Sequence, residues 1–316
     1  MPGLTPEQLS SFSKNGYLVL PNYLTPEETT ACLTETHHLL DTFPLDTHPL
    51  TQFTTGDDPS TTAKHVGDNY FLTSGDKVRF FFEPDAFAPP SSSDPTSKPT
   101  LTKPKHLAVN KIGHSLHSLS PPFRAISLSE KNASIAKSLG FKDPRVLQSM
   151  VICKQPGIGG AVPSHRDSEF LYTDAPSAVG WWFALQDAGS GNASLGMYKG
   201  SQTEGIKRRF VRVRGEGGEI GTGFVGNEGA RVPVGVEESE EVGENEGKEE
   251  DLEILDVKAG SLVLIHGNVL HKSERNTGDR SRFAYTFHVI EGAEGWKYDE
   301  RNWLQPTGEG FSKLYQ

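Results

Sequence analysis

The sequence predicts a mostly β fold with flanking helices, in which the strands close into a jelly roll or barrel. Helix signals are concentrated before about residue 145, and short β-rich segments separated by Gly and Pro turns follow. Because no helical pattern separates these segments, a closed or sandwiched antiparallel architecture is favoured. A chain of 316 residues can also bury a core of its own. We therefore expect one domain over 1–316, with a helix-rich part over 1–145, a jelly-roll core over 146–290 and an extension over 291–316.

The first two helices are predicted from their end signals. Thr5 is a helix-capping residue followed by Pro at the first helical position, and Gly16 ends this helix. A strand over 17–20 follows. Thr25 then begins a second helix that reaches about Asp41. The apolar face available to this helix consists of Ala31, Leu33, Leu39 and Leu40.

A third helix is predicted over 130–139, because Gly140 is the residue type that commonly follows the last helical turn. Beyond residue 145 the β-rich segments are rich in branched and aromatic residues. They include 147–154, 180–186, 210–213, 252–257, 261–266 and 282–290.

Two segments are expected to be exposed loops. Residues 88–105 are rich in Pro and Ser, which predicts a flexible loop or lid. Residues 215–251 are expected to form a long acidic insertion. Within and just beyond it, 237–253 holds ten acids and one base, or −9 of the net charge of −10. A solvated loop is the simplest interpretation of such a charge run, and a docking segment for a basic partner is the alternative.

Several classes of protein are excluded by composition. Cys32 and Cys153 are the only cysteines and form no CxxC motif, which predicts a reduced, cytoplasmic protein. No apolar run is long enough for a membrane helix, and the N-terminus lacks the pattern of a signal peptide. Residues 221–226 match GxGxxG without the helix that a dinucleotide site requires.

A basic cluster over 207–214 lacks interleaved aromatics, so we expect no nucleic-acid partner. Strand-edge charges that face the acidic loop are the favoured interpretation, and a contact to a coenzyme-A phosphate is the alternative.

The residues that indicate a metal-binding site are His165, Asp167 and His271. In an extended segment, positions i and i+2 point to the same side, so His165 and Asp167 can bind one ion together. A second His from a distant strand completes a set of two imidazoles and one carboxylate. Non-haem Fe(II) oxygenases use this set and leave further positions open. The residue types alone also leave Zn or Ni open.

Arg282 opens a strand whose inward face is predicted to carry Arg282, Ala284, Thr286 and His288. A buried guanidinium is costly unless it is paired, and a carboxylate accepts two parallel hydrogen bonds from it. A dicarboxylate that also chelates the metal would satisfy both groups, and Ser273 could add a hydroxyl. The alternative is a structural pair between Arg282 and a Glu.

The sequence resembles the phytanoyl-CoA dioxygenase family of Fe(II)- and 2-oxoglutarate-dependent oxygenases over residues 5–307. The resemblance is most specific in 109–114, 148–150, 165–167 and 264–288. It departs from the family pattern at Gln202, where many relatives have His, and in the acidic run.

The resemblance implies a double-stranded β-helix, the cupin-like form of the jelly roll. It implies that His165, Asp167 and His271 bind the iron, with no catalytic residue beyond these ligands. The implied contacts to 2-oxoglutarate are Lys111, Met150, Trp182, Ser273 and Arg282. Fe(II), 2-oxoglutarate and O₂ are therefore the expected cofactor and cosubstrates, with ascorbate as a reductant that keeps the iron ferrous.

The predicted reaction is hydroxylation of an unactivated C–H bond with release of succinate and CO₂. The expected partner is a small-molecule substrate, namely an acyl-CoA, an amino acid or a secondary metabolite, for a monomer or homodimer without a nucleic-acid or membrane partner. Two alternatives remain at this point. One is a catalytically idle sensor or scaffold that binds 2-oxoglutarate or metal, and the other is a Zn or Ni hydrolase or isomerase of the cupin type.

Overall fold

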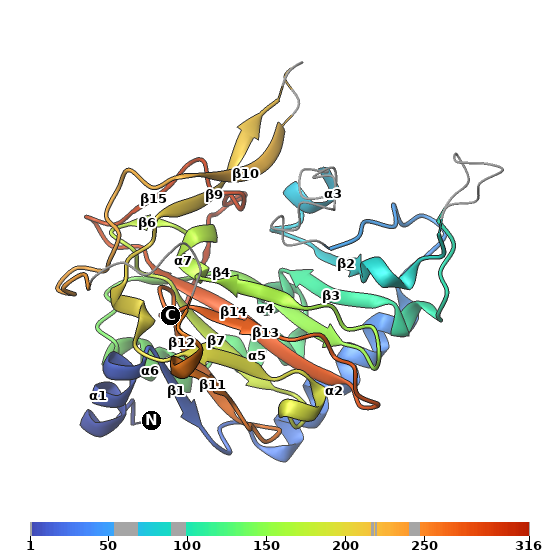
Figure 1. The fold of residues 1–316 in the computed structure, drawn as a ribbon, viewed down its shortest axis with the longest axis horizontal. Helices are drawn as coiled ribbons and strands as arrows, with labels where there is room; N and C mark the ends of the chain where they lie inside the picture. Colours follow the sequence, from blue (N-terminus) through green and yellow to red (C-terminus); the bar gives the residue numbers. More distant parts are fainter. Residues whose placement is uncertain are drawn as a thin grey trace.

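The computed structural model describes residues 2–53, 69–89, 99–215, 218, 220–239 and 247–315. Two antiparallel sheets pack on each other to form the jelly roll that the sequence predicts (Figure 1). The large sheet has the strand order β1-β12-β7-β14-β4-β3-β2, with β16 paired to β4, and the small sheet has the order β11-β8-β13-β5.

Each strand predicted from the sequence is present with the same or shifted ends, whereas the short strands β2, β3, β8, β13 and β16 were not among the predicted segments. The large sheet contains β1 (Tyr17–Leu20), β2 (Val78–Phe82), β3 (Val109–His114), β4 (Pro144–Lys154), β7 (Val179–Ala184), β12 (Leu262–His266), β14 (Arg282–Glu291) and β16 (Ser312–Lys313). The small sheet contains β5 (Val162–His165), β8 (Leu195–Tyr198), β11 (Leu252–Ile254) and β13 (His271–Ser273). Two further pairs are β6 (Thr173–Asp174) with β15 (Lys297–Tyr298), and β9 (Arg208–Arg214) with β10 (Ile220–Gly226).

The helices are mostly N-terminal, as predicted. They are α1 (Pro6–Asn15), α2 (Pro26–Thr42), α3 (Asn69–Leu72), α4 (Leu116–Leu119), α5 (Pro121–Ser127), α6 (Glu130–Ser138) and α7 (Asp167–Phe170). Thr5 and Gln8 form a capping box at the start of α1, and Gly16 ends it with a φ of 81°. Among the described residues, every helix is too short or too polar to cross a bilayer.

The apolar face of α2 agrees with the predicted one except at Ala31, since Leu40 is buried and Leu33 and Leu39 pack against the core. Cys32, Thr36 and Leu40 are buried, whereas Ala31 is exposed. The buried residues follow a spacing of four, which keeps them on one side of the helix. At about 100° per residue, Leu33 and Leu39 flank this row, whereas Ala31 lies farther round the helix and faces solvent.

The main core lies between the helices and one face of the large sheet. On β14, Phe283, Tyr285 and Phe287 belong to this core. Because alternate residues of a strand face opposite sides, the other face of β14 is left for polar residues, as predicted. Arg282, Thr286 and His288 line the pocket on that face.

The prediction of a long loop over 215–251 is wrong in its first part. All seven residues of β10 pair with β9, and Figure 1 shows this hairpin projecting from the body of the molecule. Glycine at alternate positions of β10 hid the strand in the sequence, because glycine disfavours strands on its own. The GxGxxG match is thus strand, without the helix of a dinucleotide site. Residues 240–246 lie outside the described part.

Two arginines of the basic cluster on β9 form ion pairs with other parts of the fold. Arg208 pairs with Glu169 at 3.4 Å, and Arg209 pairs with Asp299. Both partners lie outside 215–251, and the expected contact of this cluster with the acidic loop stays a prediction. In the predicted loop over 88–105, Ala88 donates to the carbonyl of Thr100 at 2.8 Å, and residues 90–98 lie outside the described part.

Candidate metal and cosubstrate site

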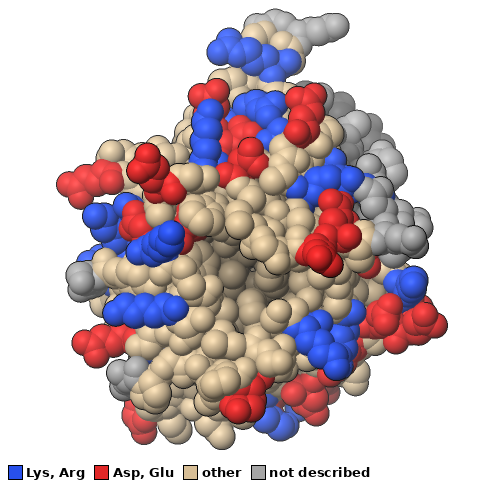
Figure 2. Space-filling view, turned by 90° about the vertical axis from the view of Figure 1, so that its left-hand side faces the viewer, with Lys and Arg blue, Asp and Glu red and all other residues tan. Residues whose placement is uncertain are grey.

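A pocket of about 170 Å³ opens on the inward face of the large sheet. Its floor follows the register of the strands. Met150 of β4 is opposite Thr286 of β14, which is opposite Trp182 of β7. The next row contains Gln148 and His288. The face drawn in Figure 2 is hollowed at its centre with uncharged walls, and charged residues surround the hollow.

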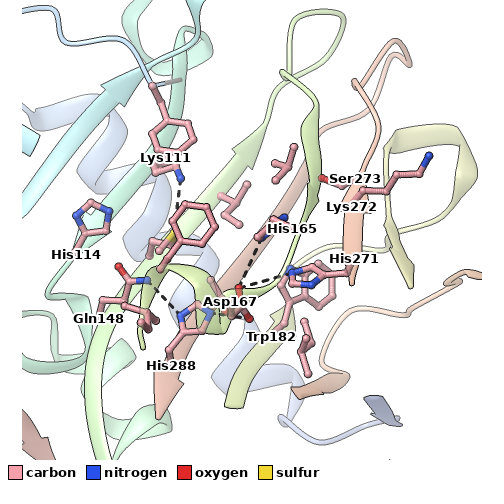
Figure 3. Close-up of a pocket in the computed structure, with 18 of the residues that line it drawn as sticks. Lys111, His114, Gln148, His165, Asp167, Trp182, His271, Lys272, Ser273 and His288 are labelled. Atoms are coloured by element: carbon pink, nitrogen blue, oxygen red, sulfur yellow. Dashed lines mark hydrogen bonds and ion pairs between the residues drawn. The ribbon is translucent and has the colours of Figure 1, made fainter. Parts of the chain in front are cut away.

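The three predicted metal ligands lie together at this pocket (Figure 3). His271 and His165 are opposite each other on the neighbouring strands β13 and β5. Asp167 Oδ1 is 3.7 Å from His165 Nε2 and 3.8 Å from His271 Nε2. One ligand atom from each residue lies within 4.8 Å of the others, which is a suitable arrangement for one metal ion.

The reason for the proximity of His165 and Asp167 differs in part from the predicted one. The strand β5 ends at His165, and Asp167 is the first residue of the one-turn helix α7. Arg166 between them is still extended, with φ −118° and ψ 129°. This single extended residue keeps the two side chains on the same side.

The backbone orients both imidazoles. Nδ1 of His165 lies 2.9 Å from the carbonyl of Pro163, and Nδ1 of His271 lies 3.1 Å from the carbonyl of Val269. A carbonyl only accepts, so each Nδ1 carries the proton and each Nε2 presents a lone pair. This is the orientation that a metal ion requires of a histidine.

The charge states also suit a cation. Burial and the neighbouring His271 lower the pKa of His165 to about 3. Burial opposes ionisation of Asp167, but the charges of His288 and His271 outweigh it and hold the pKa of this carboxyl below its usual range. At neutral pH the group therefore offers a neutral imidazole at His165 and an ionised carboxylate at Asp167.

Sequence reasoning missed two residues that position Asp167. His288 Nε2 lies 3.2 Å from Asp167 Oδ2, on the side away from the other two rings. Gly180 makes room for this contact, since a Cβ there would lie 3.3 Å from Asp167 Oδ2 and 3.5 Å from His288 Nε2. His288 was expected on the inward face of its strand, but no pattern indicated that it reaches Asp167.

Arg282 is the most buried basic group of the pocket, with 1% of its surface exposed. Its Nε and Nη2 both donate to the carbonyl of Ala193, at 3.1 and 2.8 Å, and its Nη1 has no partner. Burial lowers the pKa of Arg282 to about 10, so the group stays charged at neutral pH. Among the described residues, Arg282 donates to a backbone carbonyl and no Glu pairs with it, which argues against the structural pair weighed above.

The remaining predicted cosubstrate residues line the same pocket. Lys111 Nζ lies 3.9 Å from Met150 Sδ and 3.1 Å from the centre of the Phe53 ring. Burial lowers the pKa of Lys111 to about 7, although the charge of Glu83 opposes this shift. The indole Nε1 of Trp182 is buried without a partner.

These unpartnered donors fit 2-oxoglutarate. A buried guanidinium and a buried indole each lack an acceptor, and a carboxylate supplies acceptors for both. The triad in the same pocket can bind the other end of a keto acid together with the metal ion. The residues present therefore suit both Fe(II) and 2-oxoglutarate.

Gln202, the departure from the family pattern, lies outside this pocket. Its Nε2 donates to the carbonyl of Ser13 at 2.7 Å. The amide thus holds the end of α1 against the jelly roll, and its role here is structural.

Comparison with known proteins supports the same chemistry. The family model described as "Phytanoyl-CoA dioxygenase (PhyH)" matches residues 12–284. The chain is 41% identical over 322 residues to phytanoyl-CoA dioxygenase domain-containing protein 1 of Bos taurus, with 100% of both chains covered. It is 37% identical over 302 residues to phytanoyl-CoA dioxygenase of Arabidopsis thaliana, covering 96% of this chain and 94% of that one.

A solved structure confirms the double-stranded β-helix. The chain matches the non-haem α-ketoglutarate-dependent epimerase SnoN from nogalamycin biosynthesis with a TM-score of 0.56 and 15% identity. The match covers 98% of each chain. At this identity the likeness establishes the fold and leaves the reaction to be argued from the site.

Proposed function

The chain belongs to the phytanoyl-CoA dioxygenase family, whose members are 2-oxoglutarate-dependent non-haem iron oxygenases, and from this premise we propose that it hydroxylates an unactivated C–H bond of a small molecule. One observation carries the proposal. The His165, Asp167 and His271 group and a buried Arg282 with an unpartnered Nη1 lie in one pocket. The two hydrogen bonds from Arg282 to the Ala193 carbonyl leave its Nη1 available to a carboxylate in the pocket.

The proposed roles follow from the donor set. His165, Asp167 and His271 hold the iron on one side and leave further positions open. Fe(II) with 2-oxoglutarate and O₂ supplies the oxidising power when bound, with release of succinate and CO₂. Arg282 binds the carboxylate of 2-oxoglutarate that is remote from the metal, and the Trp182 indole donates to the same cosubstrate.

The other pocket residues orient the reactants and exclude water. His288 donates to Asp167 Oδ2 and leaves Oδ1 for the metal ion. The amino group of Lys111, whose pKa burial lowers to about 7, offers a hydrogen-bond donor beside Met150. The walls are largely apolar, so the reacting groups are removed from bulk water.

Succinate formation tests the proposal. Purified protein with Fe(II), 2-oxoglutarate and O₂ is incubated with a panel of acyl-CoAs, amino acids and small hydrophobic metabolites. We expect substrate-dependent succinate, which His165→Ala and Asp167→Ala abolish. His106→Ala is the matched control, because His106 lies at the surface and does not line the pocket.

The same experiment separates the alternatives. Turnover that persists in both ligand variants would contradict the assignment of the iron. Tight binding of 2-oxoglutarate without succinate would favour a sensor or scaffold. Metal analysis of protein purified without added metal would reveal zinc or nickel if the site serves a hydrolase or isomerase.

A further inference from the structure

Two polar residues of the pocket have no part in the roles assigned above. Gln148 and His114 come from the neighbouring strands β4 and β3 and lie on the same side of the pocket (Figure 3). Gln148 is 5% exposed and His114 is 2% exposed. Both lie in segments on which the family resemblance is most specific. Their hydrogen bonds determine what each can still offer to a ligand.

The orientation of Gln148 follows from a chain of contacts that begins at Asp167. A carboxylate only accepts, so His288 Nε2 is the donor in the 3.2 Å contact with Asp167. The other ring nitrogen of His288, Nδ1, lies 3.5 Å from Gln148 Nε2. The amide oxygen of Gln148 remains, buried and without a partner. A ligand with a hydrogen-bond donor would satisfy it.

The free nitrogen of His114 is fixed in the same way. The hydroxyl of Ser74 donates its one hydrogen to the carbonyl of Phe71 at 2.6 Å. The Ser74 oxygen must therefore accept from His114 Nδ1, which lies 2.7 Å away. Burial and the charge of Lys111 lower the pKa of His114 to about 3, so the ring is neutral. Nε2 of His114 is thus a second acceptor.

Aromatic rings surround these two acceptors. Phe71 and Trp303 stack with ring centres 4.4 Å apart, and the His114 ring lies 5.2 Å from Trp303. Phe170 and Phe210 form a further aromatic pair in the lining, with centres 5.2 Å apart. Apart from Asp167, no carboxylate among the described residues lines the pocket, so a cationic substrate would have no anion of its own.

We propose that the substrate is a small apolar or aromatic molecule with an O–H or N–H group, which donates to Gln148 Oε1 and can reach His114 Nε2. The inference rests on the proposed function and specifies its substrate class. Gln148 is two hydrogen bonds from Asp167, so the donor group binds close to the C–H bond that reacts. A plain acyl chain carries no donor near its reacting carbons and leaves both acceptors unpaired.

Matched pairs of probes test this inference on protein loaded with Mn(II) and 2-oxoglutarate. Indole is compared with benzofuran, and phenol with fluorobenzene, because each pair differs in the donor and little in size. By titration calorimetry we expect the donor-bearing member to bind roughly tenfold more tightly or better. Gln148→Met keeps the side-chain length without the acceptor, and it should abolish this preference.

Two further variants control for indirect effects. His114→Phe keeps an aromatic ring without the acceptor and should lower the preference independently of Gln148. Gln8→Met removes an amide on α1, outside the pocket, and should leave the preference unchanged. Equal binding of both members of each pair would overturn the inference, as would a preference that survives Gln148→Met or failure of the donor-bearing probes to bind up to their solubility.

Binding of Mn(II) and 2-oxoglutarate is measured on the same samples. If neither binds the unmodified protein, the proposed function itself fails. If both bind and the donor preference is absent, only the substrate class is wrong.

Discussion

Replacement of Arg282 by methionine is the sharpest test of how the second carboxylate of 2-oxoglutarate is bound. The change keeps most of the apolar stem and removes a guanidinium that is 1% exposed. Hydrogen bonds to a charged group contribute on the order of 1.5–3 kcal/mol, and about 1.4 kcal/mol corresponds to a factor of ten. We therefore expect 2-oxoglutarate to bind roughly 10- to 150-fold more weakly to Arg282→Met.

A second keto acid assigns this loss to one carboxylate. 2-Oxovalerate has the same five-carbon chain and keto acid group but lacks the remote carboxylate. Titration calorimetry on Mn(II)-loaded protein gives four dissociation constants, for two proteins and two ligands, which form a double-mutant cycle. The unmodified protein should prefer 2-oxoglutarate, and Arg282→Met should bind both keto acids with similar affinity.

Structural side effects need their own control, because Arg282 also donates twice to the carbonyl of Ala193. The melting temperature and the Mn(II) affinity of the variant show whether the pocket is intact. Arg275→Met removes an exposed guanidinium outside the pocket, which pairs with Asp85. Full discrimination between the keto acids in Arg282→Met would refute the reasoning, because another group would then bind the carboxylate.

Two further predictions concern the metal site and the pH dependence of stability. Gly180→Ala places a Cβ 3.3 Å from Asp167 Oδ2 and should weaken Mn(II) binding roughly tenfold, since groups that orient a ligand contribute about this much to affinity. Gly191→Ala, with nothing within 4 Å of the added Cβ, should bind Mn(II) like the unmodified protein, and equal affinities for both variants would contradict the packing argument. Burial lowers the pKa of His117 from 6.5 to about 4. The unfolded chain therefore binds a proton at this residue at a higher pH than the folded protein does, and the stability of the fold decreases as the pH drops below 6.5. This ring lowers the free energy of unfolding by up to about 1.4 kcal/mol per pH unit. Measured by urea unfolding between pH 6.5 and 4, the free energy of unfolding of His117→Asn should therefore decline less steeply than that of the unmodified protein. An identical decline in both proteins would mean that other groups are responsible.

Local signals in the sequence predicted much of the fold correctly. Thr5 and Gly16 mark the ends of α1, and the alternation of β14 separates the core face from the pocket face. Such features depend on neighbours within a few residues, which the sequence displays directly. The metal group was also visible, because His165 and Asp167 are close in the chain and His271 follows a strong apolar strand.

The parts that were missed depend on contacts between distant residues. The contact of His288 with Asp167 and the space left by Gly180 arise from the register of β14 and β7 and from the position of α7 beside them. The strands of the small sheet have three or four residues, which is too short for a periodic pattern. Met150 and Trp182 have the composition of ordinary core residues, and only the family resemblance linked them to the cosubstrate.

The position of His165 and His271 on paired strands has a consequence for the stability of the small sheet. β5 is a four-residue strand at the end of the small sheet, with few backbone partners of its own. A metal ion bound by both rings would hold this end strand against its neighbour. A ligand that binds the native state and not the unfolded chain stabilises the native state. A bound metal ion would then stabilise this edge of the small sheet in addition to serving the reaction.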